Sequence, residues 1–258
     1  MELEQFMLDV GADGVAVVTF NRPPVNAQNL RTREEITWIF DSISDRDDVR
    51  CAVLIGEGKM FCAGADIKER AAFGSEPGSY RRHNRLTRES FYAVTECAKP
   101  VIAAVNGGAL GAGLALALAC DVILMADEAF VAMPEIDVGL AGGGRFLQRY
   151  FGRSFLRYMY FTGTRIPAAE LYRLGIVQRC VPKDALLDAA LEIARTIARK
   201  SPLAVRLAKN ALNVVEGMGV RDGYRFEQDV TVALSSSEDA REAQRAFVEK
   251  REPVFKGR

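Results

Sequence analysis

The 258-residue chain carries 34 lysine and arginine residues against 34 aspartate and glutamate residues, so its formal net charge is zero. A neutral chain that is 49% hydrophobic and 26% charged suits a globular protein, and it offers no charge excess for nucleic acid or an anionic membrane. Its five cysteines are widely spaced without a C-x-x-C pair, which argues against a disulfide framework or zinc ribbon and favours the reducing cytoplasm.

The first part of the chain predicts two strands with a helix between them. Residues 15–20 are rich in β-branched side chains, and residues 51–56 form a short apolar run. Both patterns are typical of buried strands. Apolar residues recur at helical spacing between 36 and 43, and Thr32 is the expected cap of that helix.

Residues 69–85 are polar and contain glycine and proline, so we expect a mobile loop there. The segment holds His83, the only histidine of the sequence. A lone histidine has no second imidazole with which to build a metal site, and acid–base catalysis would require a partner. We therefore expect a solvated surface histidine and no metal site.

Residues 100–120 carry no charge and are long enough to cross a bilayer. The glycines within 106–113 indicate a turn instead, between a strand at 101–105 and a helix at 114–120. Another strand is expected at 122–126, with a short partner strand at 130–132.

Helical patterns dominate the chain from residue 153 onward. Helices are expected at 168–174, 185–200, 202–216, 220–234 and 238–250, with one strand at 176–181. Strands that alternate with helices predict an α/β fold with a parallel sheet covered on both faces. We divide the chain into a core, residues 1–195, and a C-terminal helical region, residues 196–258.

Three segments combine small or acidic residues just after predicted strands, where α/β proteins form ligand sites. They are residues 60–68, 106–113 and 133–139. Small side chains let a ligand approach backbone N–H groups, and a helix that starts at 111–113 would favour negative charge beside it. One donor from each of the first two segments would form an oxyanion hole for a thioester enolate. Taken alone, each segment is also compatible with a tight structural turn.

The sequence Phe61-Cys62-Ala63-Gly64-Ala65-Asp66-Ile67, followed by the glycine-rich segment 106–113, resembles the enoyl-CoA hydratase/isomerase, or crotonase, superfamily. Residues 21–27, 134–136 and 247–251 also fit this family in the same order, so the resemblance covers essentially the whole chain. It implies a crotonase-like spiral of ββα units and a helical C-terminal region that mediates trimerisation, often into hexamers. It further implies an acyl-CoA thioester as substrate, with no cofactor besides the coenzyme A that the substrate carries.

The resemblance also assigns roles to individual residues. The N–H groups of Ala65 and Ala112 would form the oxyanion hole. The coenzyme A site would be formed by Pro24, Val25, Ala63 and Lys250. Lys250 commonly contacts the ligand of a neighbouring subunit in this family, although a lysine at this position also fits a solvated helix surface.

The sequence departs from family hydratases at one of their two catalytic glutamates. The second glutamate is present as Glu135, but the first position holds Ala115, which cannot carry a proton. One carboxylate suffices to move a proton between two carbons, and family isomerases keep only this glutamate, so Δ3-to-Δ2 enoyl-CoA isomerisation is the favoured reaction. The apolar residues around Glu135 suit such a base. Asp137 would share its face if the segment were extended, and would otherwise be solvated.

Other reactions stay open. Glu135 alone, or with an unrecognised group, could support hydration, and the same enolate chemistry serves decarboxylation or hydrolysis. A non-catalytic acyl-CoA-binding protein is a further alternative. The segment 139–144 is shorter than its usual hydratase counterpart, so we expect a reshaped acyl pocket.

Overall fold

The structure is a computed structural model, and it describes residues 1–71 and 76–258. Its main sheet has six strands in the order β1-β2-β3-β5-β7-β10. These strands are β1 (Phe6–Val10), β2 (Val15–Phe20), β3 (Cys51–Gly56), β5 (Val101–Val105), β7 (Val122–Ala126) and β10 (Arg179–Val181). Only β1 runs antiparallel to its neighbour, and the other pairs are parallel. The predicted α/β class with a parallel sheet is therefore confirmed.

A smaller sheet has the strand order β4-β6-β8-β9. Its strands are β4 (Met60–Cys62), β6 (Gly108–Leu110), β8 (Phe130–Ala132) and β9 (Ile166–Pro167). β4, β6 and β8 follow β3, β5 and β7 after short turns, so the chain runs from each of these three main-sheet strands directly into the small sheet. The short strand expected beside 122–126 therefore exists, but it pairs with β6 and β9.

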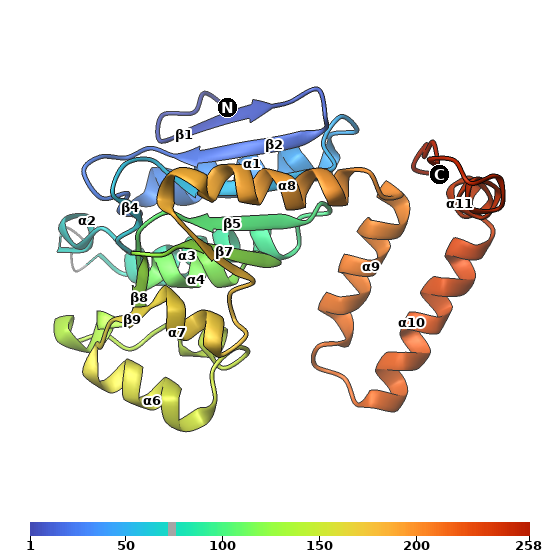
Figure 1. Cartoon of the computed structure of the whole chain (residues 1–258). Helices are drawn as coiled ribbons and strands as arrows, with labels where there is room; N and C mark the ends of the chain where they lie inside the picture. The colour runs from blue at the N-terminus through green and yellow to red at the C-terminus, as the bar shows by residue number, and fades with distance from the viewer. Residues whose placement is uncertain (72–75) are drawn as a thin grey trace.

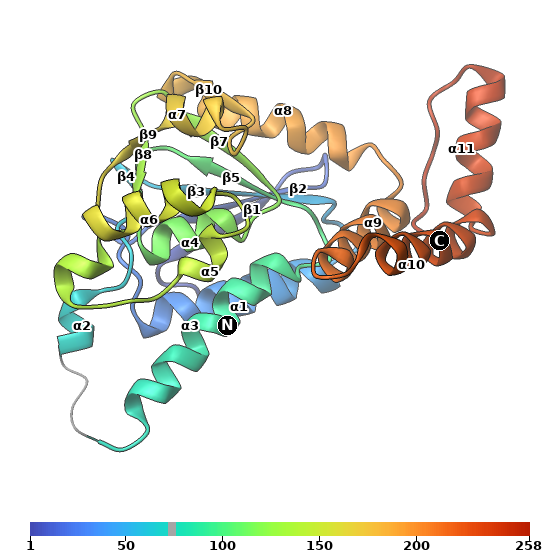
Figure 2. The ribbon, with the colours of Figure 1, turned by 90° about the horizontal axis from the view of Figure 1, so that it is seen from below.

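Helices cover both faces of the main sheet (Figures 1 and 2). The helices α1 (Leu30–Asp45), α3 (Ser79–Thr95) and α4 (Ala112–Leu118) lie on one face, and α8 (Leu186–Ala198) packs on the other. Shorter helical segments surround the small sheet: α2 (Ile67–Ala71), η1 (Pro134–Val138), α5 (Gly144–Leu147), α6 (Arg153–Thr162), α7 (Ala168–Arg173) and η2 (Lys183–Ala185). This arrangement buries the continuous apolar strands that the sequence predicted.

Helix α1 begins earlier than the sequence indicated. Its N-cap is Asn29, whose Oδ1 accepts a hydrogen bond of 2.9 Å from the Thr32 N–H. In turn, Thr32 Oγ1 accepts a hydrogen bond of 3.1 Å from the Asn29 N–H. The expectation that Thr32 is the cap was therefore wrong, because the two residues form a capping box in which Thr32 is the third helical residue.

The predicted loop at 69–85 is largely helical at its two ends. Helix α2 reaches residue 71 and α3 begins at Ser79, while residues 72–75 lie outside the described residues. His83 is on α3 and only 9% exposed, with its Nδ1 3.4 Å from Arg33 Nη1. The expectation of a solvated histidine was wrong, because α3 packs this face against α1.

The last three helices extend away from the sheet (Figures 1 and 2): α9 (Pro202–Val215), α10 (Val220–Ser235) and α11 (Glu238–Glu249). Lys209 of α9 anchors them to the core, because its Nζ donates to Asp121 Oδ2 at 2.8 Å and to the Lys99 carbonyl at 3.0 Å. The proposed boundary between residues 195 and 196 falls within α8, and this division stays a prediction. Within the described ranges, no helix has the length and apolar character of a membrane span.

Candidate active site

Two segments from different parts of the chain touch each other where β4 and β6 end. A Cβ added to Gly64 would lie 2.7 Å from the Leu110 carbonyl oxygen and 3.5 Å from the Ala112 nitrogen. A Cβ on Gly113 would lie only 2.3 Å from the Cys62 carbonyl oxygen. Glycine at both positions is therefore what allows the two backbones to approach this closely.

The two alanines that the sequence proposed as donors belong to these segments. Gln28 pairs with Ala65 as an isolated parallel bridge: its N–H donates to the Gly64 carbonyl at 2.7 Å, and its carbonyl accepts from Asp66 at 2.8 Å. Since successive residues of an extended chain face opposite sides, this bridge directs the Ala65 N–H away from Gln28. Ala112 is the first residue of α4, where an N–H has no acceptor within the helix.

A cavity of about 480 Å³ opens beside these segments. Its walls include Ala63, Gly64, Ala65, Gly111, Glu135 and Asp137. Several apolar side chains in the walls, among them Ile67 and Leu140, give it the apolar character that suits an acyl group. Segments after β4, β6 and β8 therefore contribute to one cavity, as the positions of the three motifs had predicted.

Glu135 lies directly against the glycine turn. A Cβ on Gly111 would lie 2.2 Å from Glu135 Oε1, so glycine at this position leaves room for the carboxylate where it now lies. Gly111 also has a φ of 51°, a backbone conformation that glycine adopts readily. The structure thus brings the proposed base next to the residue that precedes Ala112.

The segment that carries Glu135 is a short 3-10 helix, η1, and not an extended chain. The condition under which Glu135 and Asp137 would share a face, an extended segment, is therefore not met. Both still line the cavity, and the Asp137 carboxylate lies beside Gly163, where an added Cβ would be 2.9 Å from Oδ2. Asp137 is exposed, as expected of a solvated carboxylate.

Tyr160 of α6, which no sequence motif singled out, holds the glycine-rich segment that follows η1. Its hydroxyl accepts a hydrogen bond of 2.6 Å from the Gly142 N–H and donates one of 2.8 Å to the Gly142 carbonyl. Burial raises the pKa of Tyr160, the Gly142 N–H opposes this change, and the nearby charge of Glu135 adds to it. Tyr160 thereby holds Gly142 in place, two residues after Leu140, which lines the cavity.

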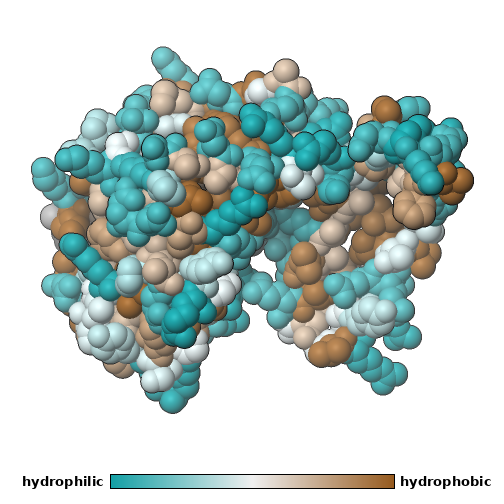
Figure 3. Space-filling model, in the orientation of Figure 1, coloured by the Kyte–Doolittle hydropathy of each residue, from teal (hydrophilic) through white to brown (hydrophobic). Residues whose placement is uncertain are grey.

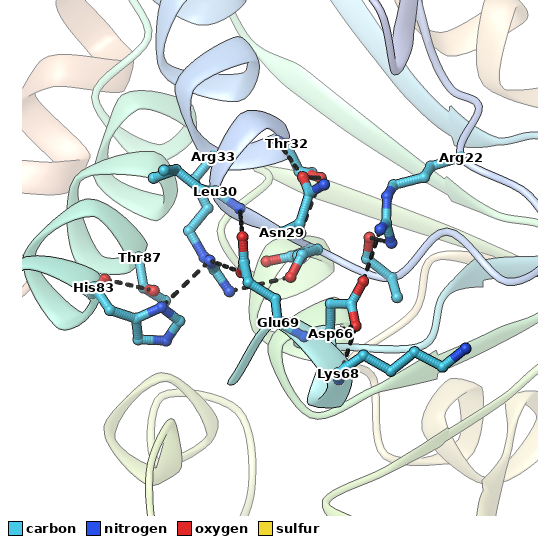
Figure 4. A network of polar contacts seen from close by, with 12 residues as sticks. Arg22, Asn29, Leu30, Thr32, Arg33, Asp66, Lys68, Glu69, His83 and Thr87 are labelled. Atoms are coloured by element: carbon cyan, nitrogen blue, oxygen red, sulfur yellow. Dashed lines mark hydrogen bonds and ion pairs between the residues drawn. The ribbon is translucent and has the colours of Figure 1, made fainter. Parts of the chain in front are cut away.

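A polar network supports the Ala65 side of the site (Figure 4). Arg22 Nη2 donates to Asp66 Oδ2 at 2.7 Å, while Asp66 Oδ1 accepts from the N–H groups of Lys68 and Glu69 at 3.0 and 3.3 Å. Burial raises the pKa of Asp66, but these hydrogen bonds outweigh burial, so the pKa is below its ordinary value. Asp66 therefore caps α2 as a carboxylate.

The same network connects α2 to α1 and α3. Glu69 accepts a hydrogen bond of 2.7 Å from the Leu30 N–H at the start of α1, and its other oxygen lies 3.4 Å from Arg33 Nη1. Arg33 is almost fully buried and also donates to the Gln28 carbonyl at 3.2 Å. Figure 4 shows Arg33 between Glu69 and His83. These contacts fix the position of the backbone on both sides of Ala65.

The four residues predicted for coenzyme A do not all lie together. The Ala63 N–H donates to the Val25 carbonyl at 3.0 Å, which places the Pro24–Val25 turn beside the cavity wall. Lys250 is exposed at the end of α11, far from β4 and α2 in Figure 1. In one copy of the chain, Lys250 is therefore remote from the other three. No group of three or more potential metal ligands occurs among the described residues.

Comparisons with known proteins agree with this geometry. Residues 11–258 match the family model described as enoyl-CoA hydratase/isomerase. The chain is 38% identical to a carnitinyl-CoA dehydratase of Citrobacter koseri, an alignment covering 93% of this chain and 94% of that protein. It is 36% identical to a short-chain-enoyl-CoA hydratase of Clostridium acetobutylicum, with 97% of each chain covered.

A crystal structure of an enoyl-CoA hydratase from Bacillus anthracis superimposes with a TM-score of 0.94 at 35% identity, covering 99% of this chain and 100% of that one. The likeness thus includes the C-terminal helices as well as the two sheets. Together with the family match over nearly the entire sequence, it shows that the chain belongs to the enoyl-CoA hydratase/isomerase family of the crotonase superfamily.

Proposed function

We propose that the protein is an enzyme that stabilises the enolate of an acyl-CoA thioester between the N–H groups of Ala65 and Ala112. The proposal is supported by the contact between the segments that carry these two residues, and by the cavity beside them. Two N–H donors aimed at a developing oxyanion lower the barrier to enolate formation, with one such donor contributing about a hundredfold to a thousandfold in rate. Coenzyme A is then part of the substrate and not a separate cofactor.

Within this chemistry we favour a one-base isomerisation of a 3-enoyl-CoA. Glu135 takes a proton from C2, the electrons delocalise onto the thioester oxygen, and Glu135 returns the proton to C4 as the double bond moves to C2–C3. The observation that carries this proposal is the Glu135 carboxylate packed against Gly111 while the buried Ala115 occupies the other family position. The reaction needs no water and no second carboxylate.

Hydration of a 2-enoyl-CoA is the second candidate. It is favoured by the names of the two relatives described above, a carnitinyl-CoA dehydratase and a short-chain-enoyl-CoA hydratase. Asp137 also lines the cavity, so it offers a second carboxylate. Decarboxylation, thioester or carbon–carbon hydrolysis, and acyl-CoA binding without turnover are the remaining candidates.

The direction of an absorbance change separates these reactions. A 3-enoyl-CoA should gain the absorbance of a conjugated thioester when the protein is added, whereas hydration of crotonyl-CoA would remove it. A gain with the first substrate and no loss with the second supports isomerisation. Loss with crotonyl-CoA alone would replace it with hydration, and binding without either change would indicate a non-catalytic protein.

We further propose that three copies, or six as paired trimers, associate through the C-terminal helices, and that Lys250 reaches the coenzyme A of a neighbouring copy. Figure 3 shows apolar residues gathered on this helical region. Large apolar side chains there are strongly exposed in one copy, among them Val220 at 91% and Phe247 at 86%. An apolar surface of this kind usually marks a contact between proteins. A cytoplasmic location, with no nucleic-acid or membrane partner, remains a prediction.

A further inference from the structure

Gln28 forms hydrogen bonds with both segments of the proposed oxyanion hole, the one around Ala65 and the one around Ala112. Its backbone forms the two hydrogen bonds that flank Ala65, at 2.7 Å to Gly64 and 2.8 Å from Asp66. Its side chain reaches the other segment, where Nε2 donates to the Ala112 carbonyl at 3.1 Å. One residue therefore connects the two alanines that lie 47 positions apart in the chain, at 65 and 112.

Burying the side-chain amide of Gln28 at this position costs more free energy than burying an apolar side chain there would. Gln28 is fully buried, and its Oε1 accepts no hydrogen bond from the part of the chain that the structure describes. A buried acceptor without a partner costs free energy. The opposite orientation of the amide is worse, because Oε1 would then face the Ala112 carbonyl oxygen. Nε2 instead faces that carbonyl and lies 3.4 Å from Cys62 Sγ.

The segments that carry Ala65 and Ala112 are in close contact, so their separation is sensitive to the hydrogen bond between Gln28 Nε2 and the Ala112 carbonyl. With Gly64 and Gly113 against the opposite backbone, a small sliding movement changes where both N–H groups point. Arg33 restrains the remaining side by donating to the Gln28 carbonyl at 3.2 Å. Gln28 is thus fixed at its backbone and uses its side chain to hold the first turn of α4.

We propose that Gln28 is a positioning residue that sets the separation and direction of the Ala65 and Ala112 N–H groups through its bond to the Ala112 carbonyl. This inference rests on the proposed oxyanion hole and adds a residue to it that does not touch the substrate. Since misplacement of reacting groups by about 1 Å can reduce rates about a hundredfold, partial loss of this restraint should reduce kcat about tenfold.

The test compares Gln28→Met, which has similar length but no donor, with the wild type. The probe is 4-dimethylaminocinnamoyl-CoA, a conjugated thioester whose absorbance moves to longer wavelength when its carbonyl is polarised. Gln28→Met should bind the probe within about threefold of the wild-type affinity but with a smaller red shift, and its kcat on a 3-enoyl-CoA should fall about tenfold with KM little changed. Gln28→Leu provides a second donor-free variant if the methionine does not fold.

Gln178→Met is the matched control, since Gln178 also bonds a backbone group, the Ile123 N–H at 2.9 Å, at the β7–β10 pair away from the cavity. It should leave the red shift unchanged. A full wild-type red shift in a folded Gln28 variant would overturn the inference while leaving the proposed function intact. No red shift in the wild-type protein would instead contradict the oxyanion hole itself.

Discussion

Ala115 is the residue that most directly separates this chain from a two-glutamate hydratase. It lies on α4, one turn after the glycine turn, and is 1% exposed. Ala115→Glu should create or raise hydration of crotonyl-CoA, because it restores a second group able to transfer a proton to or from water. The measurement is the loss of conjugated-thioester absorbance by the purified variant.

The control for this variant is Ala115→Gln, which adds almost the same volume without an exchangeable carboxyl proton. It should stay inactive as a hydratase. Equal activity in the two variants would mean that added volume, and not proton transfer, causes any gain.

Asp66 gives a prediction about pH. The pKa of Asp66 is below its ordinary value in the folded protein, so its contribution to stability is present above the unfolded pKa and lost as pH falls through the folded one. Asp66→Asn should therefore lower the free energy of unfolding by about 1 kcal/mol at pH 7, and the difference from wild type should shrink below about pH 4. Urea unfolding at pH 7 and pH 3 measures this, and a difference that persists unchanged in acid would contradict it.

At this scale, sequence reasoning found the residues whose chemistry is visible in their type. Glu135 and the small residues around Ala65 and Ala112 stand in recognisable motifs, and the structure brings them to one cavity. Gln28 and Tyr160 were missed because each acts by a hydrogen bond to a backbone group distant in the chain. No local sequence pattern identifies a hydrogen-bond partner that is distant in the chain. The only signal for Gln28 in the sequence was that a polar residue directly follows Asn26-Ala27. The fold buries this position.

At the scale of secondary-structure elements, helix α4 packs closely against β4 at Gly113. Gly113→Ala would normally favour a helix, but here the new Cβ would lie 2.3 Å from the Cys62 carbonyl oxygen. We expect the overpacking to lower the free energy of unfolding by about 1–3 kcal/mol and to reduce activity by separating the two segments. Chemical denaturation measures the first effect and steady-state kinetics the second.

Gly217→Ala is the matched control, because an added Cβ there meets nothing within 4 Å. It should be neutral or slightly stabilising, since alanine restricts the unfolded chain more than glycine does. If Gly113→Ala were as stable as this control, the close contact between α4 and β4 would not exist in solution.

Most elements could be predicted because their apolar side chains either recur at helical spacing or form a short continuous run. The apolar runs at 51–56 and 101–105 became β3 and β5 with their boundaries intact. The segment 69–85 was misjudged because its polar residues lie on the exposed face of α3, and its glycine and proline precede the helix. The pairing of β8 with β6 and β9 depends on how three ββα units stack, which no single segment encodes.

For the whole molecule, the exposed apolar side chains of the C-terminal helices predict association. We expect the wild-type protein to have three or six times the monomer mass by light scattering, because burial of Val220, Phe247 and their neighbours in other copies removes apolar surface from water. Phe247→Glu should weaken this assembly and raise the KM for acyl-CoA if Lys250 acts on a neighbouring copy. A wild-type protein that is monomeric at micromolar concentration would contradict both expectations.

The general architecture could be predicted from the alternation of strands and helices, together with the family resemblance. The association of copies could not be derived in the same way, because the spacing of Val220 and Phe247 is equally compatible with packing against the protein's own core. Only their exposure in the folded chain distinguishes the two cases.

The most direct test of the central claim is the rate at which Glu135→Gln converts a 3-enoyl-CoA to the conjugated 2-enoyl-CoA. The amide keeps the size of the side chain but cannot carry the proton, so kcat should fall about 100- to 10 000-fold while the acyl-CoA still binds. Asp137→Asn, the neighbouring carboxylate on η1, should retain wild-type isomerisation. Full activity in Glu135→Gln, or a comparable loss in Asp137→Asn, would contradict a one-base reaction at Glu135.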